Sequence, residues 1–119
     1  MELTIGKRIY MENKFIIKDD SLIEFYQSLG MSGFWKMSHI SFLKAVIHYL
    51  SFMNISINEK EIAKIVCDDI KNTIPKLMKY EYTRDLLKLH FMPAIRTNNW
   101  VEIQAQVDEL QIKMWRTFK

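Results

Sequence analysis

The sequence is poor in the residues that interrupt helices and in those that cross-link a chain. Its 119 residues include three glycines, two prolines and one cysteine. So few glycines and prolines disfavour long irregular loops and favour helices. The single cysteine, Cys67, excludes a disulfide within the chain and fits a reducing compartment. We therefore expect a helical protein that works in the cytoplasm.

Sequence motifs for metal and phosphate binding are also missing. His39, His48 and His90 stand far apart, and neither they nor Cys67 show the spacing of zinc ligands. There is no P-loop and no dinucleotide-binding glycine pattern, and three glycines could hardly build either. We expect no cofactor and no metal site.

The candidate groups for acid–base or nucleophilic catalysis have simpler explanations. Adjacent acids such as Asp19-Asp20 and Asp68-Asp69 diverge by about 100° on a helix, so neither doublet forms a catalytic pair. Cys67 follows Ala63 by one turn on the apolar side of a helix, where a cysteine behaves as a small hydrophobe. A Cys67–His90 dyad requires the fold to bring the two together. We expect that the protein is not an enzyme.

No stretch is apolar enough to cross a membrane, and no secretory leader is expected. The most apolar window, 39–55, contains Lys44 and His48 and falls short of the roughly 20 apolar residues that a bilayer span needs. The formal charge of +3 comes from interspersed acids and bases, as on an ordinary solvated surface. Lysine outnumbers arginine, which is typical of AT-rich coding sequences from a virus, a phage or a low-GC microbe.

The clearest positive signal is an amphipathic helix over residues 98–119. One of its faces carries apolar residues at alternating steps of three and four: Trp100, Ile103, Val107, Leu110 and Met114. Asn99 stands three residues before Glu102, which is the spacing of a capping box. Such a face must cover a neighbour in its own fold or in another chain, so a homo-oligomer formed through this helix is one alternative.

Two helices are predicted in the first half of the chain. The first begins near residues 19–21 and stops at Gly30. The second follows Ser38 and runs over about 39–53. It is apolar nearly all round, which is typical of the centre of a bundle, and its narrow polar strip places His48 at the surface.

Two more helices are predicted before the terminal one. A third begins at Asn58, where Glu61 completes a capping box. Pro75 ends or resets it, and a fourth runs over about 75–91 until Pro93. Residues 1–18, rich in β-branched and aromatic side chains, form either a short β-hairpin or an arm. The predicted fold is all-α: a compact single-domain bundle (1–119) of about five helical segments.

Helices over about 59–67 and 73–80 resemble a helix-turn-helix, in which the small Ala63 permits close helix crossing. The residues that would contact nucleic acid are Lys71, Asn72, Thr73, Lys76 and Lys79. Against this, Cys67 or Asp68 occupies the position usually taken by glycine, acids lie beside the turn, and Pro75 lies inside the reading helix. Two core helices that meet at a proline are the simpler interpretation.

The residue types that anchor protein interfaces gather in the loop 31–37 and at the C-terminal tip. They are Met31, Phe34, Trp35, Met37, Trp115 and Phe118. The alternative is that Phe34 and Trp35 fold back over the central helix. We predict a small non-catalytic adaptor or regulatory subunit that binds another protein or a larger assembly. A helix-turn-helix DNA-binding regulator is the alternative.

Overall fold

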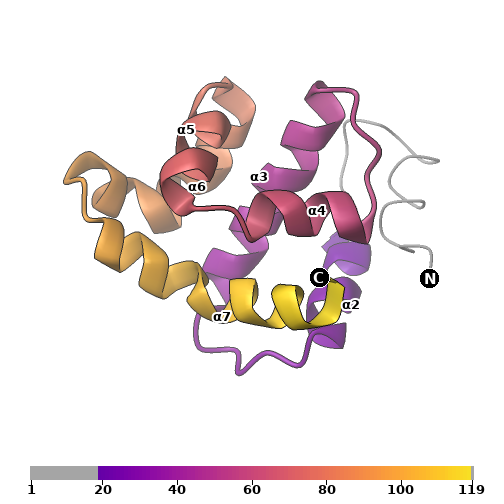
Figure 1. Ribbon diagram of the computed structural model, residues 1–119. Helices are drawn as coiled ribbons and strands as arrows, with labels where there is room; N and C mark the ends of the chain where they lie inside the picture. The colour runs from indigo at the N-terminus through magenta and orange to yellow at the C-terminus, as the bar shows by residue number, and fades with distance from the viewer. Residues whose placement is uncertain (1–18, 119) are drawn as a thin grey trace.

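All the regular structure in residues 19–118, the part of the chain that the computed structural model describes, is helical. The helices are α2 (Asp19–Ser28), α3 (Lys36–Phe52), α4 (Glu59–Val66), α5 (Ile70–Met78), α6 (Glu81–Arg96) and α7 (Trp100–Phe118) (Figure 1). The predicted all-α bundle is confirmed. The hairpin or arm predicted for residues 1–18 lies outside the described residues.

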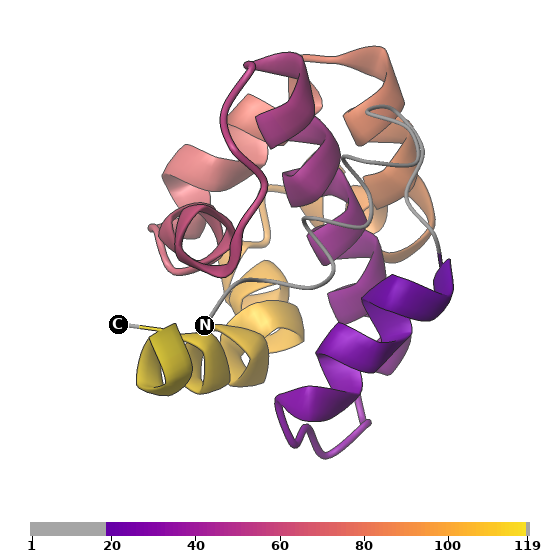
Figure 2. The same ribbon diagram turned by 90° about the vertical axis from the view of Figure 1, so that its right-hand side faces the viewer.

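Helix α3 forms the centre of the bundle. Each of the other five helices packs against it, and Figure 2 shows it running between α2 and the later helices. Phe42, Leu43 and Ile47 of α3 have no exposed surface, and the ring of Phe42 lies 5.9 Å from that of Phe91 in α6. The central position predicted for this helix is confirmed, because a helix that is apolar nearly all round can be covered only by neighbours on several sides.

His48 of α3 is buried, so its predicted place at the surface is wrong. The ring of Tyr82 from α6 meets it edge-on with ring centroids 4.6 Å apart, and Phe52 lies 6.2 Å away. Burial, and secondly the charge of Lys44, lowers the pKa of His48 to about 4. At His48 the polar strip of α3 is covered by a helix that begins about thirty residues later, which no local pattern reveals.

The two prolines lie inside helices and do not end them. The predicted third helix is divided in two: α4 stops at Val66, and α5 contains Pro75. Pro93 likewise lies within α6, which continues to Arg96. Both rings are exposed, so water can bond the carbonyl groups that a proline leaves without an N–H partner. The expected five segments are therefore six within the described residues.

The predicted starts of the third and the terminal helix, and the predicted glycine stop of the first, are present. The Oδ1 atom of Asn58 accepts from the N–H of Glu61 over 2.9 Å, and that of Asn99 accepts from the N–H of Glu102 over 3.1 Å. Helix α2 stops just before Gly30, whose φ of +69° lies in the left-handed region that glycine tolerates. These signals are local, and for that reason the sequence alone reveals them.

Candidate protein-binding surface

The loop between α2 and α3 is fastened to α7 by one carboxylate. The backbone N–H of Ser32 donates to Oε2 of Glu109 over 3.0 Å, and the Ser32 hydroxyl donates to Oε1 over 2.8 Å. Gly33 has a φ of +89°, a conformation that residues with a Cβ rarely adopt. A sharp turn and two hydrogen bonds to α7 therefore define where the loop lies.

Glu109 also influences two buried groups behind the loop. The Tyr26 hydroxyl and Nδ1 of His39 are hydrogen-bonded over 2.8 Å. Burial, and secondly the charge of Glu109, raises the pKa of Tyr26 to about 12, whereas burial lowers the pKa of His39 against the opposing effect of Glu109. Burial raises the pKa of Glu109, but the bonds from Ser32 and the charges of His39 and Lys113 outweigh it and leave that pKa below its usual range. The carboxylate is therefore charged at neutral pH.

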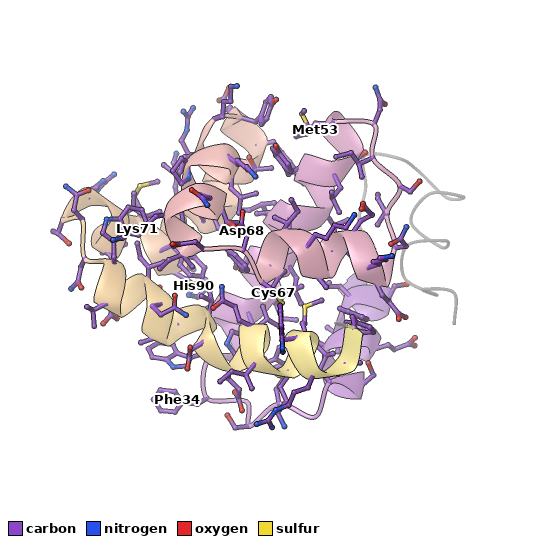
Figure 3. All side chains as sticks on the ribbon, viewed as in Figure 1. Phe34, Met53, Cys67, Asp68, Lys71 and His90 are labelled. Atoms are coloured by element: carbon purple, nitrogen blue, oxygen red, sulfur yellow. The ribbon has the colours of Figure 1, made fainter. Side chains whose placement is uncertain are left out.

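The predicted anchors of the loop differ in exposure. Phe34 is 79% exposed and Met37 61%, while Trp35 is half-buried and Met31 packs against the core. The ring of Trp35 meets that of Phe34 edge-on, with centroids 5.0 Å apart. Phe34 lies beside α7 at the lower edge of the molecule (Figure 3), so it does not fold back over the central helix. We call these four residues the loop patch.

Met37 belongs to the first turn of α3, so the loop is shorter than expected. Trp35 occupies the N-cap position, which was predicted for Ser38, and the helix begins at Lys36, three residues before the predicted start at His39. Met37, one of the two exposed residues of the loop patch, therefore lies on the first turn of the central helix.

The two aromatic anchors predicted at the C-terminal tip also differ in exposure. Trp115 is 57% exposed, whereas Phe118 is half-buried and packs against the core. The ring of Phe118 stacks on that of Phe25 in α2, with centroids 6.1 Å apart and an interplanar angle of 15°. Phe118 thus fastens the end of α7 to α2, and Trp115 remains at the surface.

Helix α7 carries a second apolar face, which the sequence analysis missed. Val101, Ala105, Ile112 and Trp115 are all exposed, and at 100° per residue they fall within an arc of about 80°. Val101 is 83% exposed. We call these four residues the α7 stripe. Their spacing of four, seven and three residues was visible in the sequence, but the series from Trp100 to Met114 already explained the helix as amphipathic.

Two hollows that share Asp108 lie beside the α7 stripe and the connection between α4 and α5, and we call them together the groove. One end is lined by Asp69, Ile70, Lys71, Trp100, Val101, Gln104, Ala105 and Asp108. The other end is lined by Cys67, Asp108, Gln111, Ile112, Trp115 and Arg116. Asp108 belongs to both ends, so a carboxylate lies where they meet, and each end also holds apolar side chains of the α7 stripe.

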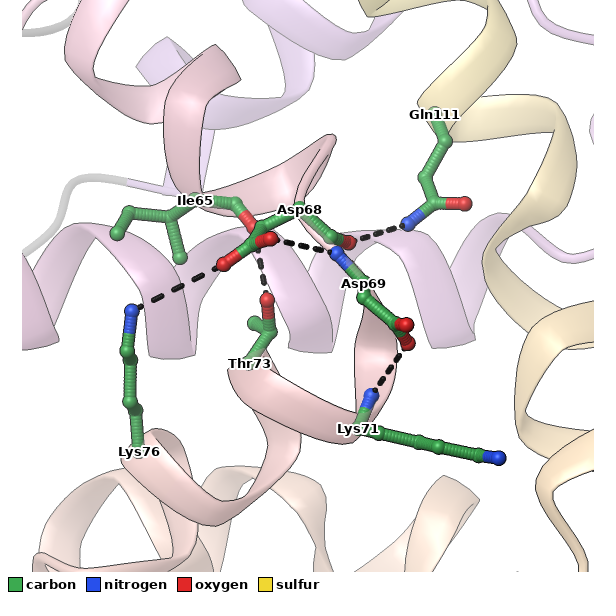
Figure 4. Close-up of polar contacts among 7 residues, drawn as sticks. All are labelled: Ile65, Asp68, Asp69, Lys71, Thr73, Lys76 and Gln111. Atoms are coloured by element: carbon green, nitrogen blue, oxygen red, sulfur yellow. Dashed lines mark hydrogen bonds and ion pairs between the residues drawn. The ribbon is translucent and has the colours of Figure 1, made fainter.

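The residues predicted to bind DNA do not all reach the surface (Figure 4). Lys71, Asn72, Lys76 and Lys79 are exposed on α5 or just after it. Thr73 is buried, and its hydroxyl donates to the carbonyl of Ile65 over 3.0 Å. The Lys76 ammonium lies 3.9 Å from a carboxylate oxygen of Asp68. The basic face is therefore smaller than the sequence suggested.

The turn between α4 and α5 covers only residues 67–69, so the predicted turn over 68–72 and reading helix over 73–80 are misplaced. Helix α5 begins at Ile70, where the side chain of Asp69 caps it by accepting from the N–H of Lys71 over 2.9 Å. Gln111 of α7 donates to the carbonyls of Val66 and Asp68 over 2.9 and 3.1 Å. These bonds hold the turn against α7.

The side chains considered for metal binding and catalysis do not form a metal site in the part of the chain that the structure describes. Within residues 19–118, no three His, Cys, Asp or Glu side chains are arranged so that they could hold a metal ion. Cys67 is half-buried at the end of α4, with its Sγ atom 3.5 Å from the carbonyl oxygen of Gln111, and His90 is half-buried on α6. No helix in this range is long and apolar enough to cross a membrane.

No protein-family model, curated protein or solved structure matches the chain.

Proposed function

We propose that the protein is a non-catalytic adaptor or regulatory subunit that binds other protein surfaces through the loop patch and the exposed side of α7. The observation that carries this proposal is where apolar side chains are exposed. Of nine large apolar side chains exposed in residues 19–118, five lie in these two regions: Phe34, Met37, Val101, Ile112 and Trp115. Single exposed apolar residues are common on soluble proteins, but grouped ones are typical of binding sites.

The loop patch has the properties of an anchor. The ring of Trp35 contacts Phe34, and Ser32 is bonded to Glu109, so part of the freedom of the loop is already lost before binding. A phenylalanine moved from water into a partner's pocket contributes about 1.5–3 kcal/mol. Aromatic residues of this kind supply most of the binding energy of many interfaces.

A photo-crosslinking amino acid at position 34 tests the proposal in extracts of the source cell. We expect one discrete cross-linked partner, because a bound protein would cover Phe34. The matched control is position 89, since Leu89 is 81% exposed and stands on α6. Cross-linking that is equally weak, or equally diffuse, at both positions would contradict the proposal.

The double variant Phe34→Ala/Met37→Ala gives the quantitative test. We expect it to weaken binding of the captured partner by roughly tenfold or more, because truncating central anchors of an interface typically costs more than 1 kcal/mol. Circular dichroism should be unchanged, since both side chains are exposed. Unaltered binding by this folded variant would reject the loop patch as the contact site.

DNA binding by α4 and α5 is a second candidate, favoured by the exposed Lys71, Asn72 and Lys79 that follow a short turn. Asp68 and Asp69 oppose it, because they place negative charge beside the same surface. If the protein binds DNA in this way, its affinity in a gel-shift titration should fall steeply with salt, because phosphate contacts release counterions. Lys71→Glu/Lys79→Glu should then abolish binding, and Lys88→Glu on α6 should not. The same weak signal in all three proteins would exclude this function.

A further inference from the structure

We propose that the α7 stripe pairs with the α7 stripe of a second copy of the chain, in an antiparallel dimer whose two-fold axis passes beside Asp108. This inference rests on the proposed function in one respect, since it takes the exposed side of α7 as an interaction surface and names its occupant. The loop patch remains available to a different protein.

The order of residues in the stripe fits pairing with itself. In a two-fold interface the same surface meets itself, so residue i contacts residue j of the second copy and j contacts i. Val101 and Trp115 lie seven residues to either side of Asp108, and Ala105 and Ile112 lie three and four residues to either side. Antiparallel pairing therefore sets Val101 against Trp115 of the second copy, and the small Ala105 against the branched Ile112. Small residues opposite large ones let two helices interdigitate.

The charges at the two ends of α7 favour the antiparallel direction. Glu102 lies in the first turn and Arg116 in the last turn, and both are exposed on the same flank of the stripe. In an antiparallel pair this flank meets the same flank of the second copy, so each Glu102 approaches Arg116, whereas a parallel pair puts the two flanks on opposite sides of the interface and brings no such opposite charges together. Complementary charges of this kind fix the orientation of an interface.

Asp108 limits the strength of the pairing. On the axis, the two Asp108 side chains approach each other, and like charges repel. Lys71 lines the groove beside Asp108, so one cation from each copy offsets part of this repulsion. A helix of 19 residues is about 28 Å long, so the contact is at the small end of specific interfaces, for which we expect micromolar dissociation.

Sedimentation velocity of the full chain over about 1–500 µM tests the pairing, since a dimer populates with concentration. We expect the chain to shift from monomer to dimer across this range. Val101→Glu and Ile112→Glu should each raise the dissociation constant at least roughly tenfold, because each buries an unpaired charge. Leu89→Glu, at a similarly exposed position on α6, should leave it unchanged.

A monomer at every concentration would overturn the inference, as would a dimer that survives both stripe variants. Circular dichroism shows whether each variant is folded. Two further substitutions keep the test independent of any one variant. Asp108→Asn should tighten the dimer several-fold, and the double exchange Glu102→Arg/Arg116→Glu should restore the affinity that each single exchange loses.

Disulfide trapping in a Cys67→Ser background tests the direction of pairing. Asp108→Cys should form a covalent dimer on mild oxidation, because the two positions meet at the axis. Val101→Cys should not, because its two copies lie about 21 Å apart along the helices. Trapping at both positions would indicate parallel pairing and overturn the proposal. Phe34→Ala/Met37→Ala should leave the dimer unchanged, so a failure at the loop patch and a failure at the stripe can be told apart.

Discussion

The inner face of α7 and the α7 stripe are two apolar surfaces of one helix with different surroundings. Ile103, Val107, Leu110 and Met114 have no exposed surface, because α3, α4 and α6 pack around them. Val101 and Ile112, on the opposite side, face water. The contrast shows that apolar spacing indicates which faces of a helix need cover, while only the fold shows which of them it covers itself.

The largest expected difference is in the free energy of unfolding, between a truncation on the inner face of α7 and one on the α7 stripe. Leu110→Ala removes a fully buried side chain, so it should lower the free energy of unfolding by about 3 kcal/mol. Ile112→Ala, two residues away on the exposed side, should change it by no more than about 0.5 kcal/mol. Urea denaturation at a low protein concentration, at which a dimer is dissociated, measures both. Similar losses in the two variants would mean that the faces are not distinct.

Acid should weaken the interior of the bundle through His48. Its pKa of about 4 in the folded chain lies below the ordinary value of 6.5. Between these values the unfolded chain binds a proton that the folded chain does not. The free energy of unfolding is therefore unaffected by His48 above pH 6.5 and decreases as the pH falls from 6.5 toward 4. The loss should be of the order of a few kcal/mol. The lowered pKa of His39 acts in the same direction.

Denaturation of the wild type and of His48→Phe between pH 7 and pH 4 measures this effect. The variant keeps an aromatic ring beside Tyr82 but has no group to protonate, so its stability should fall less with acid. His90→Gln on α6 serves as the control and should follow the wild type. Equal slopes for the wild type and His48→Phe would show that His48 does not carry the effect.

The smallest of these effects concerns Glu109, which lies on the flank between the two faces of α7. Ser32→Ala removes the hydroxyl bond to Glu109 and keeps the backbone bond, so it should cost about 1 kcal/mol and speed amide exchange in residues 30–35. Thr117→Ala is a matched control, because that hydroxyl bonds a carbonyl of its own helix, that of Lys113. Faster exchange in the Thr117 variant as well would point to a general loosening.

Features that depend on neighbouring residues could be predicted from the sequence. The caps at Asn58 and Asn99 each need one side chain and an N–H three residues away, and both are present. Whether a proline ends a helix or lies inside it was harder to predict. Pro75 and Pro93 are both expected to end a helix, yet each lies on an exposed side where the missing hydrogen bond is tolerated.

Features that depend on contacts between distant segments could not be predicted. The burial of His48 is set by Tyr82, and the position of the loop patch is set by Glu109, seventy-seven residues after Ser32. Among the predicted anchors, exposure separates Phe34 and Trp115 from Met31 and Phe118, although all four are of similar residue type. Which large apolar residue reaches the surface depends on how many neighbours compete to cover it, and that is a property of the whole bundle.

The place of Cys67 gives the protein a built-in chemical reporter. It is the only thiol in the chain, and it lines the groove beside Ile112 and Trp115. Alkylation by a maleimide of moderate size should therefore slow when any macromolecule covers this side of α7, and a dye attached there should change its emission. The wild-type sequence, with no engineered cysteine, can thus be screened for ligands of the groove before any of them has been identified.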